Sequence, residues 1–336
     1  MNPILNSPPK ISIGVTEACP LQCRHCYADC AHAPKPGELS ADRWIRVLTD
    51  LAGRGVIQAY MEGGEPLAKP GIMDILRAIT PVMMTLLRTH GSGLSKSVAK
   101  DLAAAGLGRV CVDLMGVDAA THDAHTGVAG SFTEACAAIQ HAVSAGIKTD
   151  ALVIMTRQTA PHLSRIASLA QGLGAKRLGI LRLYPLGRAK LSWDELALTL
   201  DAQTQALASL VVPPGFRVMQ SWHPYDHNCC WQAAAINAFG RAIGCMYLRE
   251  YVDYGDATAI PYDQIWKNNP LYRQLRSGNV EKSCSECSGT QGSHGGCRST
   301  AYAWHGRWNA PDPFDAALND GVDLSRLPPA RSSPAP

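Results

Sequence analysis

The stretch that decides the fold is Ile11-Ser-Ile-Gly-Val15-Thr-Glu-Ala-Cys19-Pro-Leu-Gln-Cys23-Arg-His-Cys26-Tyr27. Residues 11–15 form a short β-branched run that predicts a β-strand. Three cysteines follow it with the spacing C-x3-C-x2-C. Three thiolates in one loop can hold three irons of a four-iron, four-sulfur cluster and leave the fourth iron without a protein ligand. Zinc is the alternative, but it needs four ligands, and Cys30 is either that fourth ligand or a free thiol.

Apolar runs alternate with amphipathic stretches on the C-terminal side of this loop. The predicted strands are residues 11–15, 56–61, 83–88, 109–115, 149–156 and 177–183. The predicted helices are residues 40–54, with Ser40 as N-cap, 70–79, 96–105, 132–145, 162–173 and 193–210. Six such repeats are typical of an α/β protein with a parallel sheet and helices outside it.

The chain is predicted to divide into three parts. The alternation fills residues 1–200, and after Pro213 and Pro214 the sequence changes to short segments rich in Gly, Asn and Cys. Residues 201–320 are therefore expected to be a small cysteine-rich extension. The Pro- and Ser-rich residues 321–336 are expected to be a disordered tail.

Composition excludes several classes of protein. With 336 residues, 46% hydrophobic and 18% charged, the chain can bury a sizeable core and is not disordered throughout. A net charge of +3 gives no basis for nucleic-acid or membrane-surface partners. No apolar run approaches the roughly 18 to 20 residues of a membrane span, and residues 1–10 lack a signal-peptide pattern. A cytoplasmic location is expected.

Cysteine usage is unusual for such a protein. Of the 12 cysteines, four lie between Cys19 and Cys30 and six between Cys229 and Cys297. The cytosol keeps thiols reduced, so clustered cysteines there are more often metal ligands or redox groups than disulfides. The chain is therefore expected to bind metal in two regions.

A second motif, Gly63-Gly64-Glu65-Pro66, follows the second predicted strand. Glycines let the backbone approach a ligand closely, and Glu65 supplies an acceptor. Alone, these four residues could equally form a turn.

Together the two motifs resemble the signature of the radical S-adenosylmethionine (SAM) superfamily. The resemblance implies a partial (β/α)6 TIM-like barrel with its chemistry at the carboxyl ends of the strands. It implies that the open iron of the cluster on Cys19, Cys23 and Cys26 chelates SAM, with Gly63–Pro66 meeting the methionine amino group. An electron from the cluster would then cleave SAM to a 5′-deoxyadenosyl radical, which abstracts hydrogen from a substrate.

Further SAM contacts are implied by the same resemblance. Thr89-His90-Gly91 stands where relatives often carry Thr-Asn-Gly near the ribose, so His90 is a departure. His25 stands where an aromatic residue often covers the adenine. Arg182 resembles an arginine that pairs with the SAM carboxylate, and the alternative for it is a surface ion pair.

The fourth predicted strand offers one more candidate from its alternation. Cys111 and Asp113 share a face, expected to be inward, whereas Val110 and Val112 face outward. Asp113 is a candidate catalytic residue that meets the ribose or the substrate, and a structural carboxylate is the alternative. Cys111 is expected to be a small core residue.

The C-terminal cysteines resemble the SPASM or twitch extension of one radical SAM branch. The extension implies one auxiliary four-iron cluster, whose ligands are expected to be Cys230, Cys245, Cys284 and Cys287. Cys297 or Cys229 could replace one of them. A spare Cys297 could instead donate a hydrogen atom to a product radical, and a structural Zn(Cys)4 site is a further alternative.

This extension departs from its family pattern at two positions. Ser293 stands where a third closely spaced cysteine is expected, and Phe314 follows Asp312-Pro313 where another cysteine is expected. The two-cluster set is therefore incomplete.

The resemblance predicts an enzyme, and three hypotheses about its function remain. The favoured one is post-translational modification of a peptide or protein, suggested by the region of residues 295–298. The second is oxidation, epimerisation or decarboxylation of a sugar or nucleoside-like small molecule. The third, a non-enzymatic iron–sulfur redox protein, would leave residues 63–66 without a role. A flavodoxin- or ferredoxin-type electron donor is implied for the enzyme.

Overall fold

The computed structural model describes residues 5–220, 234–276, 280–281, 296–316 and 318–330. Strands in these ranges form one sheet with the spatial order β10-β9-β8-β1-β2-β3-β4-β5-β6-β7. The strands are β1 Lys10–Gly14, β2 Gln58–Glu62, β3 Met84–Thr89, β4 Arg109–Asp113, β5 Lys148–Ile154, β6 Arg177–Leu181, β7 Arg217–Gln220, β8 Ala235–Ile236, β9 Arg241–Ala242 and β10 Gly255–Asp256.

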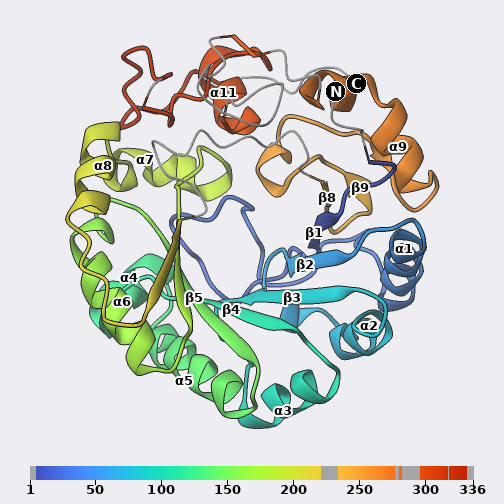
Figure 1. Ribbon diagram of the computed structural model, residues 1–336, viewed down its shortest axis with the longest axis horizontal. Helices are drawn as coiled ribbons and strands as arrows, with labels where there is room; N and C mark the ends of the chain where they lie inside the picture. Colours follow the sequence, from blue (N-terminus) through green and yellow to red (C-terminus); the bar gives the residue numbers. More distant parts are fainter. Residues whose placement is uncertain (1–4, 221–233, 277–279, 282–295, 317, 331–336) are drawn as a thin grey trace.

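Neighbouring strands from β1 to β7 are parallel, which agrees with the predicted repeats. The sheet curves around an interior and stays open (Figure 1), so the predicted partial barrel is confirmed. β7 was not predicted; it extends the sheet beyond β6 and lies past residue 200. The proposed boundary at residue 200 therefore leaves one barrel strand on its C-terminal side.

Helices cover the outer side of the curved sheet (Figure 1). The helices of the described ranges are α1 Ala41–Gly53, α2 Ile72–Ile79, α3 Lys96–Ala104, α4 Ala119–Thr126, α5 Ser131–Ser144, α6 Leu163–Gly172, α7 Trp193–Leu196, α8 Leu200–Ala208, α9 Tyr262–Asn268, α10 Pro270–Arg276 and α11 Arg298–His305. Of the helices in the described ranges, none is long and apolar enough to cross a bilayer.

Local sequence explains how the first helix begins and which face it buries. The Ser40 side chain accepts a hydrogen bond from the backbone N–H of Arg43, so the predicted N-cap is confirmed. The buried residues of α1 recur at helical spacing and are Trp44, Val47, Leu48 and Leu51. They join the core between the helices and the sheet.

Two helical features differ from the predictions. α4 was not predicted; Asp118 and Thr121 form a capping box at its start. The predicted helix 193–210 is broken into α7 and α8, because Ala197 is extended and Thr199 caps a new helix by accepting from the N–H of Ala202. The pattern of apolar residues continues across this break, so periodicity alone does not reveal it.

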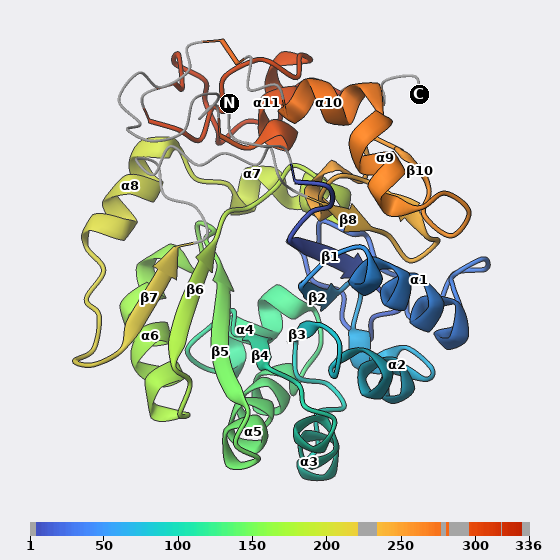
Figure 2. The same cartoon turned by 45° about the vertical axis from the view of Figure 1, so that its right-hand side comes forward.

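The C-terminal part of the chain continues the same sheet. β8 runs parallel to β1, and Ser12 N–H donates to the Ala234 carbonyl at 2.9 Å. Helices α10 and α11 lie beyond the end of the barrel toward which the arrowheads of β6 and β7 point (Figure 2). Residues 321–336 were expected to be a disordered tail. Of these, the structure describes residues 321–330, in which Leu324 is buried and its carbonyl accepts from Trp193 Nε1 at 3.2 Å.

Candidate active site and cofactor pocket

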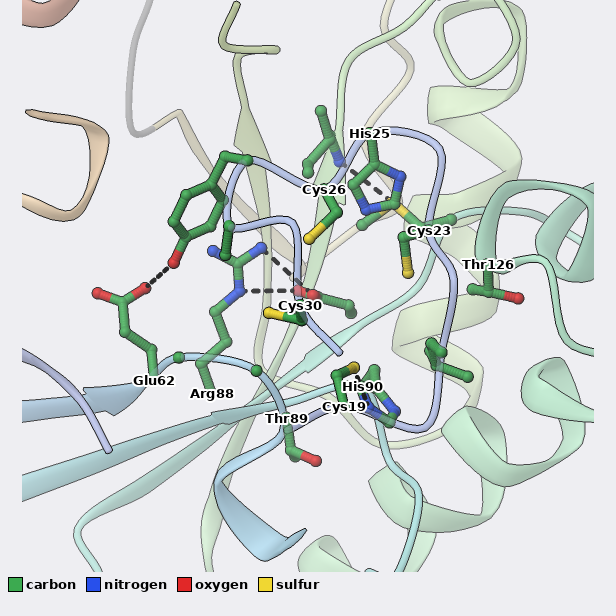
Figure 3. A pocket seen from close by; sticks show the side chains of 18 of the residues that line it. Cys19, Cys23, His25, Cys26, Cys30, Glu62, Arg88, Thr89, His90 and Thr126 are labelled. Atoms are coloured by element: carbon green, nitrogen blue, oxygen red, sulfur yellow. Dashed lines mark hydrogen bonds and ion pairs between the residues drawn. The ribbon is translucent and has the colours of Figure 1, made fainter. Parts of the chain in front are cut away.

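A cavity lies at the carboxyl ends of β2, β3 and β4, beneath the loop that follows β1 (Figure 3). Its lining includes the cysteine loop, the glycine motif and the residues that end β3 and β4. The predicted site residues in this lining are Cys19, Cys23, His25, Cys26, Gly63, Gly64, Thr89, His90 and Asp113. The structure thus brings most of the predicted N-terminal site into one place.

The thiols of Cys19, Cys23 and Cys26 face this cavity together (Figure 3). Burial raises the pKa of Cys19 to about 12 and raises the pKa of Cys23 well above its ordinary value. Buried thiolates therefore need a positive partner here, and a metal provides one by replacing the protons. Three converging thiols at this spacing fit an iron–sulfur cluster with one open iron.

A fourth thiol, that of Cys30, lines the same cavity. Hydrogen bonds from the Cys30 thiol and from the N–H groups of Cys30 and Ala28 lower the pKa of Cys26 to about 6. Cys30 is held near Cys19 by backbone pairing, since the Cys19 N–H donates to the Ala31 carbonyl at 2.7 Å. Cys30 therefore remains either a free thiol or an alternative ligand.

The glycine motif fits closely against the chain that leads to Cys19. A Cβ on Gly63 would lie 2.4 Å from the Thr16 carbonyl oxygen, and a Cβ on Gly64 would lie 2.1 Å from that of Ala18. The N–H groups of Gly64 and Glu65 donate to these same two carbonyls, each at 2.7 Å. The motif thus fixes the start of the cysteine loop and presents glycine backbone to the cavity.

Glu65 faces away from where the sequence suggested. It is not among the residues that line the cavity, and its carboxylate is already hydrogen-bonded. Oε1 accepts from the Leu67 N–H at 3.0 Å. Oε2 accepts from Thr89 Oγ1 at 2.8 Å and from the His90 N–H at 3.0 Å. Glu65 therefore joins the loop after β2 to the loop after β3, and Pro66 begins the short 3-10 turn Pro66–Ala68 (η1) beside it.

Histidines surround the side of the cavity where the resemblance places adenine. His25 lines the cavity, and its ring centroid lies 5.8 Å from that of His125 on α4. His122, also on α4, accepts from the Met115 N–H through Nδ1 at 3.1 Å. Within the described ranges, His25 Nδ1 and His122 Nε2 are buried without a hydrogen-bond partner. Such atoms are typical of a pocket that awaits a polar ligand. His122 was not among the predicted site residues, because the short helix that carries it was not predicted.

Asp113 lies in the cavity and faces inward as predicted. Its two carboxylate oxygens accept from Arg88 Nε at 3.1 Å and Arg88 Nη2 at 3.2 Å. On β2, two strands away, Glu62 accepts from Tyr27 Oη at 3.2 Å, and burial raises the pKa of Glu62. The side chains of Asp113, Arg88, Glu62 and Tyr27 thus line the cavity beside the thiols.

A second cavity, of about 540 Å³, lies inside the barrel and shares Glu62 and Arg88 with the first. Cys111 lines it, as does Asp150, which is fully buried. Asp150 accepts from Arg109 Nη1 at 2.7 Å and Arg177 Nη2 at 2.6 Å. The sequence analysis overlooked this network. Charged residues at inward positions of predicted strands were the signal that could have found it.

Arg182 is not brought to the SAM cavity, contrary to the expectation. Its Nη1 donates to Asp312 Oδ2 at 2.9 Å, and both side chains are buried. Its guanidinium also lies 5.0 Å from the ring centroid of Phe314. A buried cation needs a nearby anion, and Asp312 from the C-terminal part supplies it.

The C-terminal cysteines are described only in part. Cys229, Cys230, Cys284, Cys287 and Ser293 lie outside the described residues. Cys245 and Cys297 are described; burial raises the pKa of Cys245, and the nearby Cys297 raises it further. Cys297 lies outside the linings of both cavities described above, and its N–H donates to Asp312 Oδ2 at 2.7 Å.

An aromatic cluster connects the cysteine loop to this C-terminal region. Tyr247, two residues after Cys245, stacks on Tyr184 with ring centroids 3.7 Å apart. Tyr247 also meets Tyr27 edge-on at 5.0 Å, and Tyr27 directly follows Cys26. Packed aromatic rings therefore join the residue after Cys26 to the segment that follows Cys245.

Comparisons with known proteins agree with this geometry. Sequence models of the radical SAM superfamily and of the SPASM iron–sulfur cluster-binding domain match residues 13–170 and 229–288. The chain is 30% identical to mycofactocin maturase MftC of Mycobacterium ulcerans, covering 92% of this chain and 88% of that one. It is 26% identical to PqqA peptide cyclase of Methylocella silvestris, covering 92% and 89%.

A solved structure shares the fold. Streptococcus suis SuiB bound to precursor peptide SuiA superposes with a TM-score of 0.72, at 17% identity, over 94% of this chain and 76% of that one. The chain therefore belongs to the radical SAM superfamily, as an enzyme with a C-terminal SPASM domain whose cofactors are SAM and iron–sulfur clusters.

Proposed function

We propose that this enzyme modifies a peptide or protein, using a cluster held by Cys19, Cys23 and Cys26. The observation that carries the cluster assignment is the convergence of these three thiols on a cavity lined by Gly63 and Gly64. When bound there, the cluster supplies the electron that cleaves SAM to a 5′-deoxyadenosyl radical. A flavodoxin or ferredoxin is the proposed source of that electron.

Residues of the cavity would orient SAM and exclude water. The backbone of Gly63 and Gly64 lies beside the thiols, where the methionine end of SAM would meet the open iron. His25 would cover the adenine, and the Thr89–His90 loop would lie near the ribose. Asp113, held by Arg88, would accept a hydrogen bond from the ribose or the substrate.

The peptide assignment is supported by the relatives. The names of two relatives that match along most of this chain, a mycofactocin maturase and a PqqA peptide cyclase, describe peptide or maturation chemistry. SuiB, which shares the fold, was solved with a precursor peptide. The barrel cavity of about 540 Å³ adjoins the SAM cavity through Glu62 and Arg88, which gives a substrate side chain room beside the site of radical formation.

For the C-terminal region, we propose one auxiliary four-iron cluster on Cys230, Cys245, Cys284 and Cys287. Cys297 is the proposed replacement for one of these four ligands, because it lies beside Cys245 and away from the SAM cavity. The position of Cys297 favours its role as a cluster ligand over a role as hydrogen donor to a substrate radical.

The test separates the cleavage of SAM from the class of substrate. Anaerobically reconstituted protein, given SAM and dithionite, should form 5′-deoxyadenosine, and the Cys26→Ala variant should form none. The protein is then incubated with fractions of a deuterated extract of the source organism. Deuterium in 5′-deoxyadenosine should come from the peptide fraction and disappear after protease treatment. Deuterium from the small-molecule fraction alone would favour the alternative function.

A further inference from the structure

His90 stands where the family resemblance implies an asparagine, and its imidazole lies beside Cys19 (Figure 3) and also contacts Glu65. Its Nε2 lies 3.4 Å from Cys19 Sγ and 3.1 Å from Glu65 Oε2. The ring is buried, so water does not compete for these contacts. The chain thus places a ring nitrogen between a carboxylate and the sulfur of a proposed cluster ligand.

The neighbouring backbone indicates which ring nitrogen carries the proton. The Ser92 N–H points at His90 Nδ1 at 3.4 Å, so Nδ1 is the acceptor. We assign the hydrogen to Nε2 from this contact. Nε2–H is then a donor, and both of its neighbours are acceptors.

The ring is held in this orientation by its own backbone. The His90 N–H donates to Glu65 Oε2 at 3.0 Å, and Thr89 Oγ1 donates to the same oxygen at 2.8 Å. Since this oxygen already accepts two hydrogen bonds, the Nε2–H is available to Cys19. The negative carboxylate beside Nε2 also favours the tautomer that carries the hydrogen on this nitrogen rather than on Nδ1.

We propose that His90 is a positioning residue that donates its Nε2–H to the Cys19 thiolate and thereby raises the reduction potential of the cluster. The inference rests on the proposed function, in which Cys19 is a cluster ligand. Reduction adds a negative charge to the cluster, and a hydrogen-bond donor to a ligand sulfur stabilises that charge. Glu65, which contacts the same nitrogen, links this donor to the glycine motif.

The experiment compares substitutions that keep or remove the donor. In His90→Gln, the amide nitrogen can reach about where Nε2 lies, whereas in His90→Asn it reaches only about where Nδ1 lies. His90→Leu removes the donor altogether. His32→Asn, at an exposed histidine, is the matched control. Each full-length variant is reconstituted, and its midpoint potential is measured by redox titration followed by electron paramagnetic resonance (EPR). The N-terminal cluster is identified by the change in its signal when SAM is added.

The wild type, His90→Gln and His32→Asn should have similar midpoint potentials. His90→Asn and His90→Leu should shift to more negative potentials at unchanged iron and sulfide content. If His90 had only a structural role, His90→Gln would not keep the midpoint potential that His90→Asn lowers. Equal potentials across all fully loaded variants would overturn the inference.

Two further results distinguish a failure of this inference from a failure of the proposed function. A SAM-sensitive cluster signal that survives in Cys19→Ala would contradict the ligand assignment of the proposed function instead. If the His90 variants do not take up iron and sulfide, pulsed EPR of reduced protein labelled with 15N-histidine replaces the titration. This protein carries His25→Phe, which removes another histidine that lines the cavity. A nitrogen coupling to the cluster is expected there, and its absence would overturn the inference.

Discussion

At the scale of single residues, Gly64 sets the distance between the glycine motif and the cysteine loop. A Cβ at this position would lie 2.1 Å from the Ala18 carbonyl oxygen and 2.7 Å from its carbonyl carbon, and both are backbone atoms. No rotation of a side chain can relieve such a contact. The residue is therefore fixed by packing between two backbones, in addition to any contact with SAM.

We expect Gly64→Ala to displace the chain that carries Cys19 and to lower stability by about 1–3 kcal/mol, the usual cost of overpacking. The variant should also load less iron at the N-terminal cluster. Urea unfolding and iron analysis measure the two effects. Gly53→Ala is the control, since a Cβ there meets no atom within 4 Å. Equal iron content in Gly64→Ala and Gly53→Ala would show that the backbone of residues 16–19 tolerates the displacement.

Buried histidines should make stability depend on pH. Burial lowers the pKa of His122 and of His125 to about 4, compared with 6.5 in an unfolded chain. Between these values the unfolded chain takes up a proton that the folded protein does not, so stability falls as pH drops from about 6.5 to about 4. The loss is at most about 3 kcal/mol for each histidine.

The corresponding measurement is the free energy of unfolding between pH 7 and pH 4.5. His122→Gln and His125→Gln should each flatten its dependence on pH, because neither replacement titrates. A slope that is unchanged in both variants would assign the pH dependence to other groups, such as His25, whose pKa is also lowered by burial.

At the scale of elements, one buried ion pair attaches α11 to the barrel. Asp312 pairs with Arg182, which follows β6, and accepts from Thr300 Oγ1 and the Cys297 N–H at the start of α11. Phe314 packs on Trp304 with ring centroids 5.7 Å apart and lies beside Arg182. The position where a cysteine was expected thus holds an aromatic ring that completes this attachment.

Asp312→Asn should therefore destabilise the protein by roughly 3 kcal/mol, because it removes the carboxylate that faces the buried Arg182 guanidinium. The surface pair Asp74–Arg77 offers a control, and Asp74→Asn should change stability by no more than about 0.5 kcal/mol. Denaturant titration of both variants gives the comparison. Binding of SAM to Asp312→Asn at low temperature should stay near that of the wild type. A selective loss of SAM binding would instead return Arg182 to the SAM site.

At the scale of the whole molecule, the packed rings of Tyr27, Tyr184 and Tyr247 connect the cysteine loop with the segment that follows Cys245. Changing Cys19, Cys23 and Cys26 together to Ala should remove the N-terminal cluster and leave about four irons per chain. Iron, sulfide and zinc analysis of the anaerobically reconstituted variant measures this. About eight irons would reveal a second auxiliary cluster. Zinc with almost no iron would make the C-terminal cysteines a structural site.

Much of the architecture could be predicted from the sequence because it depends on local patterns. The six parallel strands, the Ser40 cap and the inward face of β4 follow from periods and caps that lie within a few residues. The break between α7 and α8 and the pairing of β7 with β6 depend on caps and contacts that the apolar pattern does not contain. The candidate site shows the same difference. The cysteine loop could be predicted from adjacent residues, whereas His122 could not, because its helix was not predicted.

By itself, the sequence determined the alternating α/β order, the thiols after β1 and the glycines after β2, because each is a property of adjacent residues. Only the tertiary structure decided what the charged side chains face. Glu65 turns to the loop after β3, 25 residues away, His90 reaches Cys19 across 71 residues, and Arg182 reaches Asp312 across 130. Each group is buried and must find a partner of opposite charge or a hydrogen-bond partner, and the folded chain settles which one is near.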